Sequence, residues 1–225
     1  MMISPDCYYD TYLKGKNQKQ IITAIRGLKQ QIGELKNIME HPDYSSALKV
    51  CPDESVRLEC GRLYLERAKQ ALMEAGTIYS PSKAELRAES FDASVSAISK
   101  IVFSIGGCFD GYEKYTITMD KVHLHFDVEH SFYLKPSNLP DGLDYPCGKR
   151  EFLNGIRALH IGEWRPSYRP KRFGYSVLDG TQWDLRIEFS NGHRPFKVCG
   201  DNSYPYNFNS FKRLLGIGCD SEESE

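Results

Sequence analysis

The residues best suited to chemistry in this sequence occupy alternate positions of one short segment. These residues are His123, His125, Asp127 and Glu129. If the segment is a β-strand, their side chains share one face and lie about 6–7 Å apart. Imidazole and carboxylate groups bind Zn, Fe or Mn in proteins. The pattern therefore predicts either a metal site at His123, His125 and Asp127, for a metal-dependent hydrolase, or the solvent-facing side of an antiparallel strand.

A second candidate is a basic segment, residues 149–175, in which aromatic residues alternate with cations. Seven Lys and Arg residues stand there against two Glu, an excess of five positive charges. Arg, Trp and Tyr carry most of the binding energy at protein interfaces, and cations beside aromatic rings also bind single-stranded nucleic acid. The segment therefore predicts a protein-binding surface, a nucleic-acid-binding surface, or a loop whose rings pack beneath it. The candidate binding residues are Trp164, Arg165, Tyr168, Arg169, Lys171 and Arg172.

No arrangement typical of enzyme catalysis is recognisable in the sequence. It contains no Gly-x-Ser-x-Gly elbow, no P-loop and no Rossmann glycine pattern. Cys108 follows two glycines but has no basic partner near it in the sequence. We therefore predict no catalytic residue and no cofactor, and we favour a non-enzymatic protein.

Composition narrows the class of protein further. The 225 residues include 29 Lys and Arg against 30 Asp and Glu, so the net charge of −1 does not point to a polyanionic partner for the whole chain. No apolar run approaches the roughly 20 residues that span a bilayer. The seven cysteines include no C-x-x-C pair. These features predict a cytoplasmic protein with free thiols and no membrane partner.

Two heptad patterns dominate the first third of the chain, after a polar, tyrosine-rich lead-in (residues 1–17) that we expect to be loosely held. The first apolar stripe comprises Ile21, Ile25, Leu28, Ile32, Leu35 and Met39, and the second Leu58, Gly61, Leu65, Ala68, Leu72 and Ala75. Such narrow stripes are typical of helices that pack along one seam. They predict an antiparallel helical hairpin. Its two seams could pack against each other, against a third body, or against a second copy of the chain in a homodimer.

The rest of the chain has the period of strands. Trp183, Leu185, Ile187 and Phe189 alternate with polar residues, and Asn191-Gly192 follows as a type I′ turn signal. Residues 98–128 predict a three-stranded meander, and helices are expected at 149–161 and after Asn207. The fold class is therefore α+β, with a mostly antiparallel sheet of about five strands and two helices. The expected domains are 1–95 and 96–219, followed by an acidic disordered tail at 220–225.

One pattern in this second part resembles a known domain. Asp179-Gly-Thr-Gln-Trp183 continues through Leu185 and Ile187 to Gly192, and Gly200-Asp-Asn-Ser-Tyr-Pro-Tyr-Asn207 follows. This order resembles D-G-x-x-W-x-L-x-I followed by G-x-N-x-Y-P-x-N. That pattern belongs to an uncharacterised α+β domain of bacterial hypothetical proteins, and the match covers about residues 98–217. The resemblance implies a bacterial or mobile-element origin and brings no activity with it.

Together these features predict a non-enzymatic protein that binds another macromolecule, with a protein as the first expected partner. An inhibitor of a host defence nuclease, similar to an anti-CRISPR protein, is one specific form of this hypothesis. The alternatives are the metal-dependent hydrolase and a single-stranded nucleic-acid-binding protein.

Overall fold

A computed structural model describes residues 2–46, 51–107, 111–121, 123–131 and 148–217. The chain divides into two compact units, Met1–Pro81 and Ser82–Glu225, and each is described by itself. The predicted acidic tail lies outside the described residues. Among the helices of the described part, none combines the length and the apolar character needed to cross a membrane.

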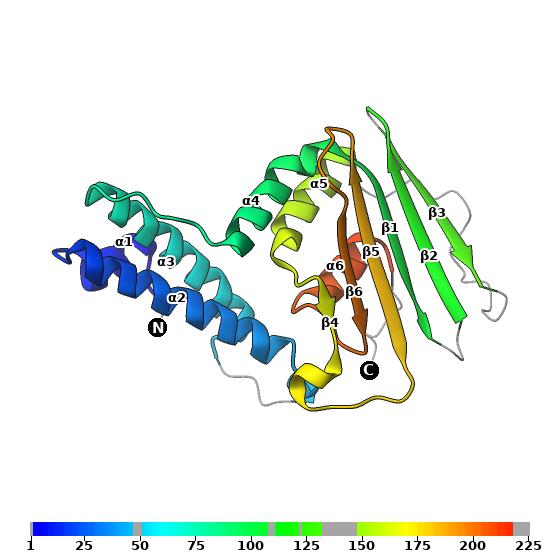
Figure 1. Ribbon diagram of the computed structural model, residues 1–225, viewed down its shortest axis with the longest axis horizontal. Helices are drawn as coiled ribbons and strands as arrows, with labels where there is room; N and C mark the ends of the chain where they lie inside the picture. Colours follow the sequence, from blue (N-terminus) through cyan, green and yellow to red (C-terminus); the bar gives the residue numbers. More distant parts are fainter. Residues whose placement is uncertain (1, 47–50, 108–110, 122, 132–147, 218–225) are drawn as a thin grey trace. The chain divides into compact units, whose positions relative to one another are not determined.

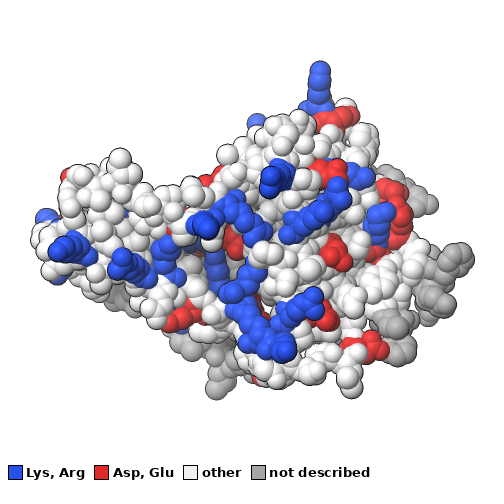
Figure 2. Space-filling view, viewed as in Figure 1, with Lys and Arg blue, Asp and Glu red and all other residues white. Residues whose placement is uncertain are grey.

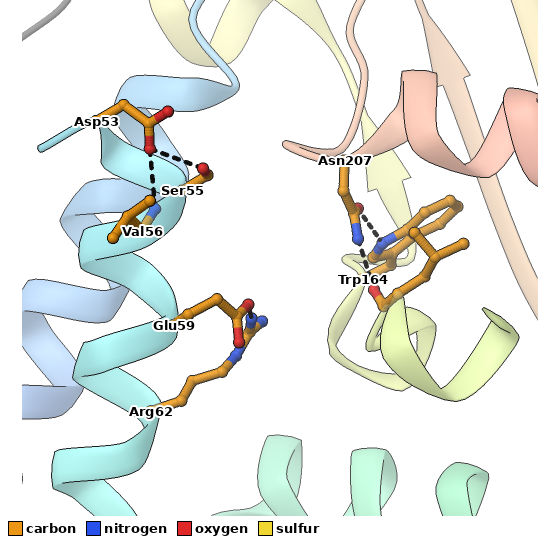
Figure 3. Close-up of polar contacts among 8 residues, drawn as sticks. Asp53, Ser55, Val56, Glu59, Arg62, Trp164 and Asn207 are labelled. Carbon is orange, nitrogen blue, oxygen red and sulfur yellow. Dashed lines mark hydrogen bonds and ion pairs between the residues drawn. The ribbon is translucent and has the colours of Figure 1, made fainter. Parts of the chain in front are cut away.

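The first unit is built on the predicted helical hairpin. It contains α1 (Pro5–Tyr8), a π-helical turn (Tyr9–Leu13), α2 (Gln18–Met39), a short 3-10 turn (Pro42–Ser46) and α3 (Glu54–Glu74). Asn17 and Gln20 form a capping box at the start of α2, and the Asp53 carboxylate accepts a hydrogen bond from the Val56 N–H at the start of α3, as Figure 3 shows. These caps place both helix starts where the sequence predicts them.

The two apolar stripes pack against each other within this unit. Ile21, Ile25, Leu28, Ile32 and Leu35 of α2 and Leu58, Leu65, Ala68 and Leu72 of α3 are buried. Gly61 allows α3 to approach the Ile32 side chain closely. Because the seams cover each other, they are not available to a second copy unless the hairpin opens.

The lead-in before the hairpin is held more firmly than the sequence suggests. Leu13 is buried, and the Tyr8 ring stacks on the Tyr64 ring of α3 with 4.4 Å between centroids. The prediction of a loose lead-in is therefore wrong, because aromatic stacking contributes where the segment lacks an apolar period.

The second unit is a six-stranded sheet with helices on one face. Its strands, in the order β3-β2-β1-β5-β6-β4, are antiparallel neighbours except for the parallel pair β4–β6. The strands are β1 (Ile98–Gly107), β2 (Gly111–Met119), β3 (Leu124–His130), β4 (Ser167–Tyr168), β5 (Thr181–Phe189) and β6 (Phe196–Asp201), and the helices are α4 (Lys83–Ser94), α5 (Lys149–Ala158) and α6 (Phe208–Leu214). The helices lie on the same side of the sheet (Figure 1).

The second unit differs from the prediction in its boundary and in its number of strands. Phe91 of α4 and Val95, just after it, are fully buried in the same cluster as the strands β1, β2, β5 and β6. Helix α4 therefore belongs to the second unit, and the boundary falls before residue 82 rather than near 95. The sixth strand, β4, escapes prediction because two residues carry no readable period.

The motif around Trp183, on which the predicted resemblance rests, has a structural explanation. The indole of Trp183 lies directly over Gly200 of the neighbouring strand, where a Cβ atom would overlap it. Its N–H donates a hydrogen bond to the carbonyl of Ser203 at 3.0 Å. Asn202 has a left-handed backbone with φ 46°, and its side-chain oxygen accepts a hydrogen bond from the Thr181 N–H at 2.8 Å. These contacts lock the end of β5 to the turn after β6.

The turn at the other end of this hairpin differs from the prediction. A type I′ turn needs a positive φ at both central residues, but at Asn191-Gly192 only Gly192, with φ 78°, has one. The connection instead spans residues 190–195, and the Asn191 side chain accepts a hydrogen bond from the His193 N–H at 3.0 Å. The His193 ring packs edge-on against Phe189. The side chain of Asn191 thus organises a wider loop in place of the tight turn.

We predict that Gly200→Ala destabilises the protein by about 1–3 kcal/mol, because the added methyl group overpacks a closed core. Urea unfolding measures the free energy. Gly33→Ala, inside α2, is the matched control: a Cβ there meets nothing within 4 Å, so the change should stabilise the protein by up to about 1 kcal/mol. Equal stability of the two variants would contradict the role assigned to the Trp183–Gly200 contact.

Candidate anion-binding surface

A basic hollow in the second unit is the strongest candidate for a functional site. Its volume is about 460 Å³, and its walls come from α4, from the segment before β4, and from the loop that enters β6. Among the described residues that line it, Arg87, Arg194 and Lys197 are cationic and none is acidic. Figure 2 shows Lys and Arg side chains gathered on the face that carries α4 and β4.

Helix α4 supplies Arg87 because both its start and its buried face are fixed. Ser82 and Glu85 form a capping box at its N-terminus. Phe91, one turn after Arg87, packs against Phe196 with 4.7 Å between ring centroids. The guanidinium of Arg87 lies 4.8 Å from the centroid of the same Phe196 ring, in cation–π distance. The ring of Phe196 thus fixes both the helix and the cation.

The charge of Arg87 is not balanced by a neighbouring acid. Burial lowers the pKa of Arg87, and among the described residues no carboxylate forms an ion pair with Arg87, Arg194 or Lys197. A partly buried cation without a partner costs free energy. An incoming anion would remove that cost, so the hollow is suited to bind one.

His193 joins the two sides of the hollow. One ring nitrogen, Nδ1, lies 2.8 Å from the carbonyl oxygen of Arg194 and the other, Nε2, lies 3.0 Å from the hydroxyl of Ser90 on α4. Because a carbonyl oxygen only accepts, Nδ1 is the donor to Arg194, and Nε2 and the Ser90 hydroxyl share a second hydrogen bond. This bridge holds the loop that carries Arg194 against the helix that carries Arg87.

The six binding residues predicted from the sequence separate into two groups. Trp164 and Tyr168 are buried, with 1% and 3% of their surfaces exposed. The other four are the exposed cations Arg165, Arg169, Lys171 and Arg172, and the guanidinium of Arg172 lies over the Phe173 ring. The prediction that Trp164 and Tyr168 contact a partner is therefore wrong, because both rings pack beneath the loop, and only the cations of that loop face solvent.

Trp164 instead anchors the loop through Asn207. The indole N–H donates a hydrogen bond to the Asn207 side-chain oxygen at 2.9 Å, as Figure 3 shows, and the Asn207 amide donates to the carbonyl of Leu159 at 2.6 Å. Asn207 lies at the start of α6, as predicted, but its side chain makes no cap hydrogen bond. It ties the segment before β4 to α6 and so sets the position of the exposed arginines.

Of the three predicted metal residues, His123 and His125 approach one carboxylate, that of Asp120, and Asp127 does not join them. His125 and Asp127 lie on the solvent face of β3, and His123 precedes the strand. The His125 ring is 3.3 Å from an Asp120 carboxylate oxygen, and His123 is 3.7 Å from the same oxygen, so both rings turn toward the β2–β3 turn rather than toward Asp127. Within the described ranges no group of three or more His, Cys, Asp or Glu side chains could hold a metal ion.

Sequence reasoning missed Arg87, His193, Arg194 and Lys197. The run His193-Arg-Pro-Phe-Lys197 was a readable signal, since two cations flank a proline and an aromatic residue. Arg87 offered none, because it is one of several charged residues on a short helix. Only the pairing of α4 with the β5–β6 loop brings it beside Arg194.

We predict that Asn207→Ala destabilises the protein by about 2 kcal/mol, because it leaves the Trp164 indole N–H and the Leu159 carbonyl without their partner. Thermal and urea unfolding followed by tryptophan fluorescence measure the loss. Asn154→Ala, at an exposed position of α5, is the control and should be nearly neutral. A neutral Asn207 variant would show that the loop is held by other contacts.

Asp92 on α4 gives a second prediction, for the dependence of stability on pH. Burial, and then the charge of Glu163, raise the pKa of Asp92 to about 6 from 3.8, and its Oδ1 atom is buried without a hydrogen-bond partner among the described residues. The folded state therefore binds a proton more tightly than the unfolded state does. Stability from this group is complete below the unfolded pKa and is lost as the pH rises through about 6.

Asp92→Asn should accordingly stabilise the protein by about 1 kcal/mol at about pH 8, a figure reduced for solvent screening because the group is only partly buried. The gain should fall toward zero at about pH 4, where the wild-type carboxyl is largely protonated in the folded state. Urea unfolding at both pH values measures it. A gain that is the same at both pH values would contradict the raised pKa.

No family model matches the chain, and searches of curated proteins and of solved structures found no match. The resemblance of residues 98–217 to a bacterial domain therefore stays a prediction. The motif residues that carry it, including Trp183, Gly200 and Asn202, hold the fold together. What the protein does must be argued from its surface.

Proposed function

We propose that this chain is a non-enzymatic protein that binds an acidic macromolecule through the cationic surface of its second unit. The observation that carries the proposal is the set of three cationic residues, Arg87, Arg194 and Lys197, among the described residues that line one hollow, none of which is acidic. Exposed Arg169 and Lys171 extend the charge along the chain segment next to it. Unbalanced cations on a fixed scaffold attract and orient an anionic partner.

A protein partner is favoured over nucleic acid for two reasons. The aromatic rings that could stack on bases, Trp164 and Tyr168, are buried. The first unit also exposes apolar side chains beside a hollow of about 670 Å³, with Leu63 at 54%, Met73 at 64% and Ile78 at 89% exposure. An apolar patch with charged neighbours is typical of protein interfaces.

Single-stranded nucleic acid remains the second candidate, because the run from Arg165 to Arg172 is cationic and exposed and would contact phosphates. The inhibitor hypothesis gains less support from this surface. The nucleic-acid channel of a nuclease is itself positively charged, so a cationic inhibitor would have to bind elsewhere on the enzyme.

The test is capture of partners from a lysate of the source organism, with and without nuclease treatment. We expect an acidic protein to bind in both lysates and to elute at about 1 M salt, where the screening length falls to about 3 Å. The double variant Arg169→Gln, Lys171→Gln should lose the partner. Arg150→Gln, a neutralised cation on α5, is the control and should retain it.

Two results would contradict the proposal. Retention of the same partner both by the double variant and by the variant Arg194→Gln, Lys197→Gln would show that the cationic surface is not the contact. Loss of all captured material after nuclease treatment, together with direct binding of single-stranded DNA or RNA, would assign the surface to nucleic acid instead.

A further inference from the structure

The hollow lined by Arg87 and Arg194 can be assigned a more specific ligand than an acidic surface. We propose that it binds a phosphate monoester, and that this group is a phosphorylated side chain of the partner protein. The inference rests on the proposed function, since it names what that partner carries. The support comes from charge, from donor geometry and from the shape of the site.

Charge favours a phosphate over a carboxylate. Arg87, Arg194 and Lys197 line the hollow, and none of its described lining residues is acidic. A single carboxylate supplies one negative charge and would leave most of this positive charge unbalanced. A phosphate monoester carries about −1.5 to −2 charges at neutral pH and three acceptor oxygens, so it offsets more of the charge of these cations.

The donors are held in place before any ligand arrives. The guanidinium carbon of Arg87 lies 4.8 Å from the centroid of the Phe196 ring, a contact that restricts where this group can lie, and no acceptor within the described ranges takes a hydrogen bond from it. The bridge from Ser90 through His193 to the carbonyl of Arg194 fixes the loop on the other side. Arginine presents planar forks that match phosphate oxygens in pairs, so little ordering is needed on binding.

The walls favour a peptide over a nucleic acid as the bearer of the phosphate. Apart from its cations, His193 and Ser90, the hollow is lined by two prolines and two phenylalanines. Pro166 and Pro195 keep the backbone rigid near the hollow. Such apolar walls suit the neighbouring side chains of a phosphorylated residue, whereas phosphodiesters carry one charge each and follow an extended groove.

The first experiment tests the subsite without any partner. Amide NMR spectra are recorded with inorganic phosphate and with chloride at equal ionic strength. We expect saturable shifts of the Arg194 and Lys197 amides with phosphate only, and their loss in Arg87→Met and in Arg194→Gln. The Met side chain keeps an apolar contact with Phe196, and Arg194 lies in an exposed loop, so at least one variant should fold. Arg150→Gln should keep the shifts.

The second experiment tests the bearer of the phosphate. A fluorescent peptide library with one phosphoserine among acidic and apolar residues is compared with the same library unphosphorylated. Phosphorylation should tighten binding by about tenfold or more, in line with charge-assisted hydrogen bonds, and Arg194→Gln should remove the difference. A 5′-phosphorylated oligothymidine should not compete better than its unphosphorylated form.

The outcomes separate this inference from the proposed function. Phosphate shifts no larger than those from chloride, or shifts that persist in Arg194→Gln, overturn the subsite, even if the acidic partner is still captured through Arg169 and Lys171. Equal binding of the two peptide libraries, or competition that depends on the 5′-phosphate of the oligonucleotide, overturns the phosphorylated protein. Intact phosphate shifts with no partner captured would count against the proposed function alone.

Discussion

The second unit depends on the contact between the Trp183 indole and Gly200. A strand that carries so large a side chain can pair closely with its neighbour only if the facing residue has no Cβ atom. The hydrogen bond from the indole to Ser203 satisfies the one polar atom of the ring inside the core. Around this pair lie Trp164 and Phe208, with ring centroids 6.2 Å and 4.8 Å from Trp183. The loop with the exposed arginines and the helix after β6 are therefore both placed by a single ring.

The sequence predicts well where a regular period meets a buried face. The heptad stripes before residue 76 and the alternation from Trp183 to Phe189 appear as helices and strands close to their expected bounds, because one buried face imposes one period. The sequence predicts poorly which side chains of an irregular segment are buried and which are exposed. Trp164 and Arg165 are neighbours, yet one is buried and the other exposed, and no local pattern encodes that choice. The partnership of Arg87 with Arg194 depends on contacts between segments about a hundred residues apart, which only the folded chain reveals.

The cationic hollow shows how a fold can maintain a charge that it does not balance. Burial of the Arg87 guanidinium opposes folding, and the flat ring of Phe196 offsets part of that cost. Phe196 in turn packs against Phe91, deep in the core of the unit. The free energy of a large apolar cluster therefore keeps a binding group in position. Trp164 and Asn207 play a similar part for the exposed arginines. Their hydrogen bond lies beneath the surface and holds in place the loop that carries those arginines.

The short strand β4 also bears on whether copies of the chain pair edge to edge. Among the described residues it pairs with β6 at Cys199 and Gly200 alone, and no other described strand covers the earlier part of that edge, an edge of the kind that recruits strands from other molecules. Pro195 immediately before this edge lacks an N–H donor, and Arg194 and Lys197 place like charges on every copy. These residues act as gatekeepers against edge-to-edge aggregation. A substitution that neutralises Arg194 or Lys197 would therefore have two effects. It would weaken the binding of an anion, and it would reduce the repulsion between the sheet edges of two copies.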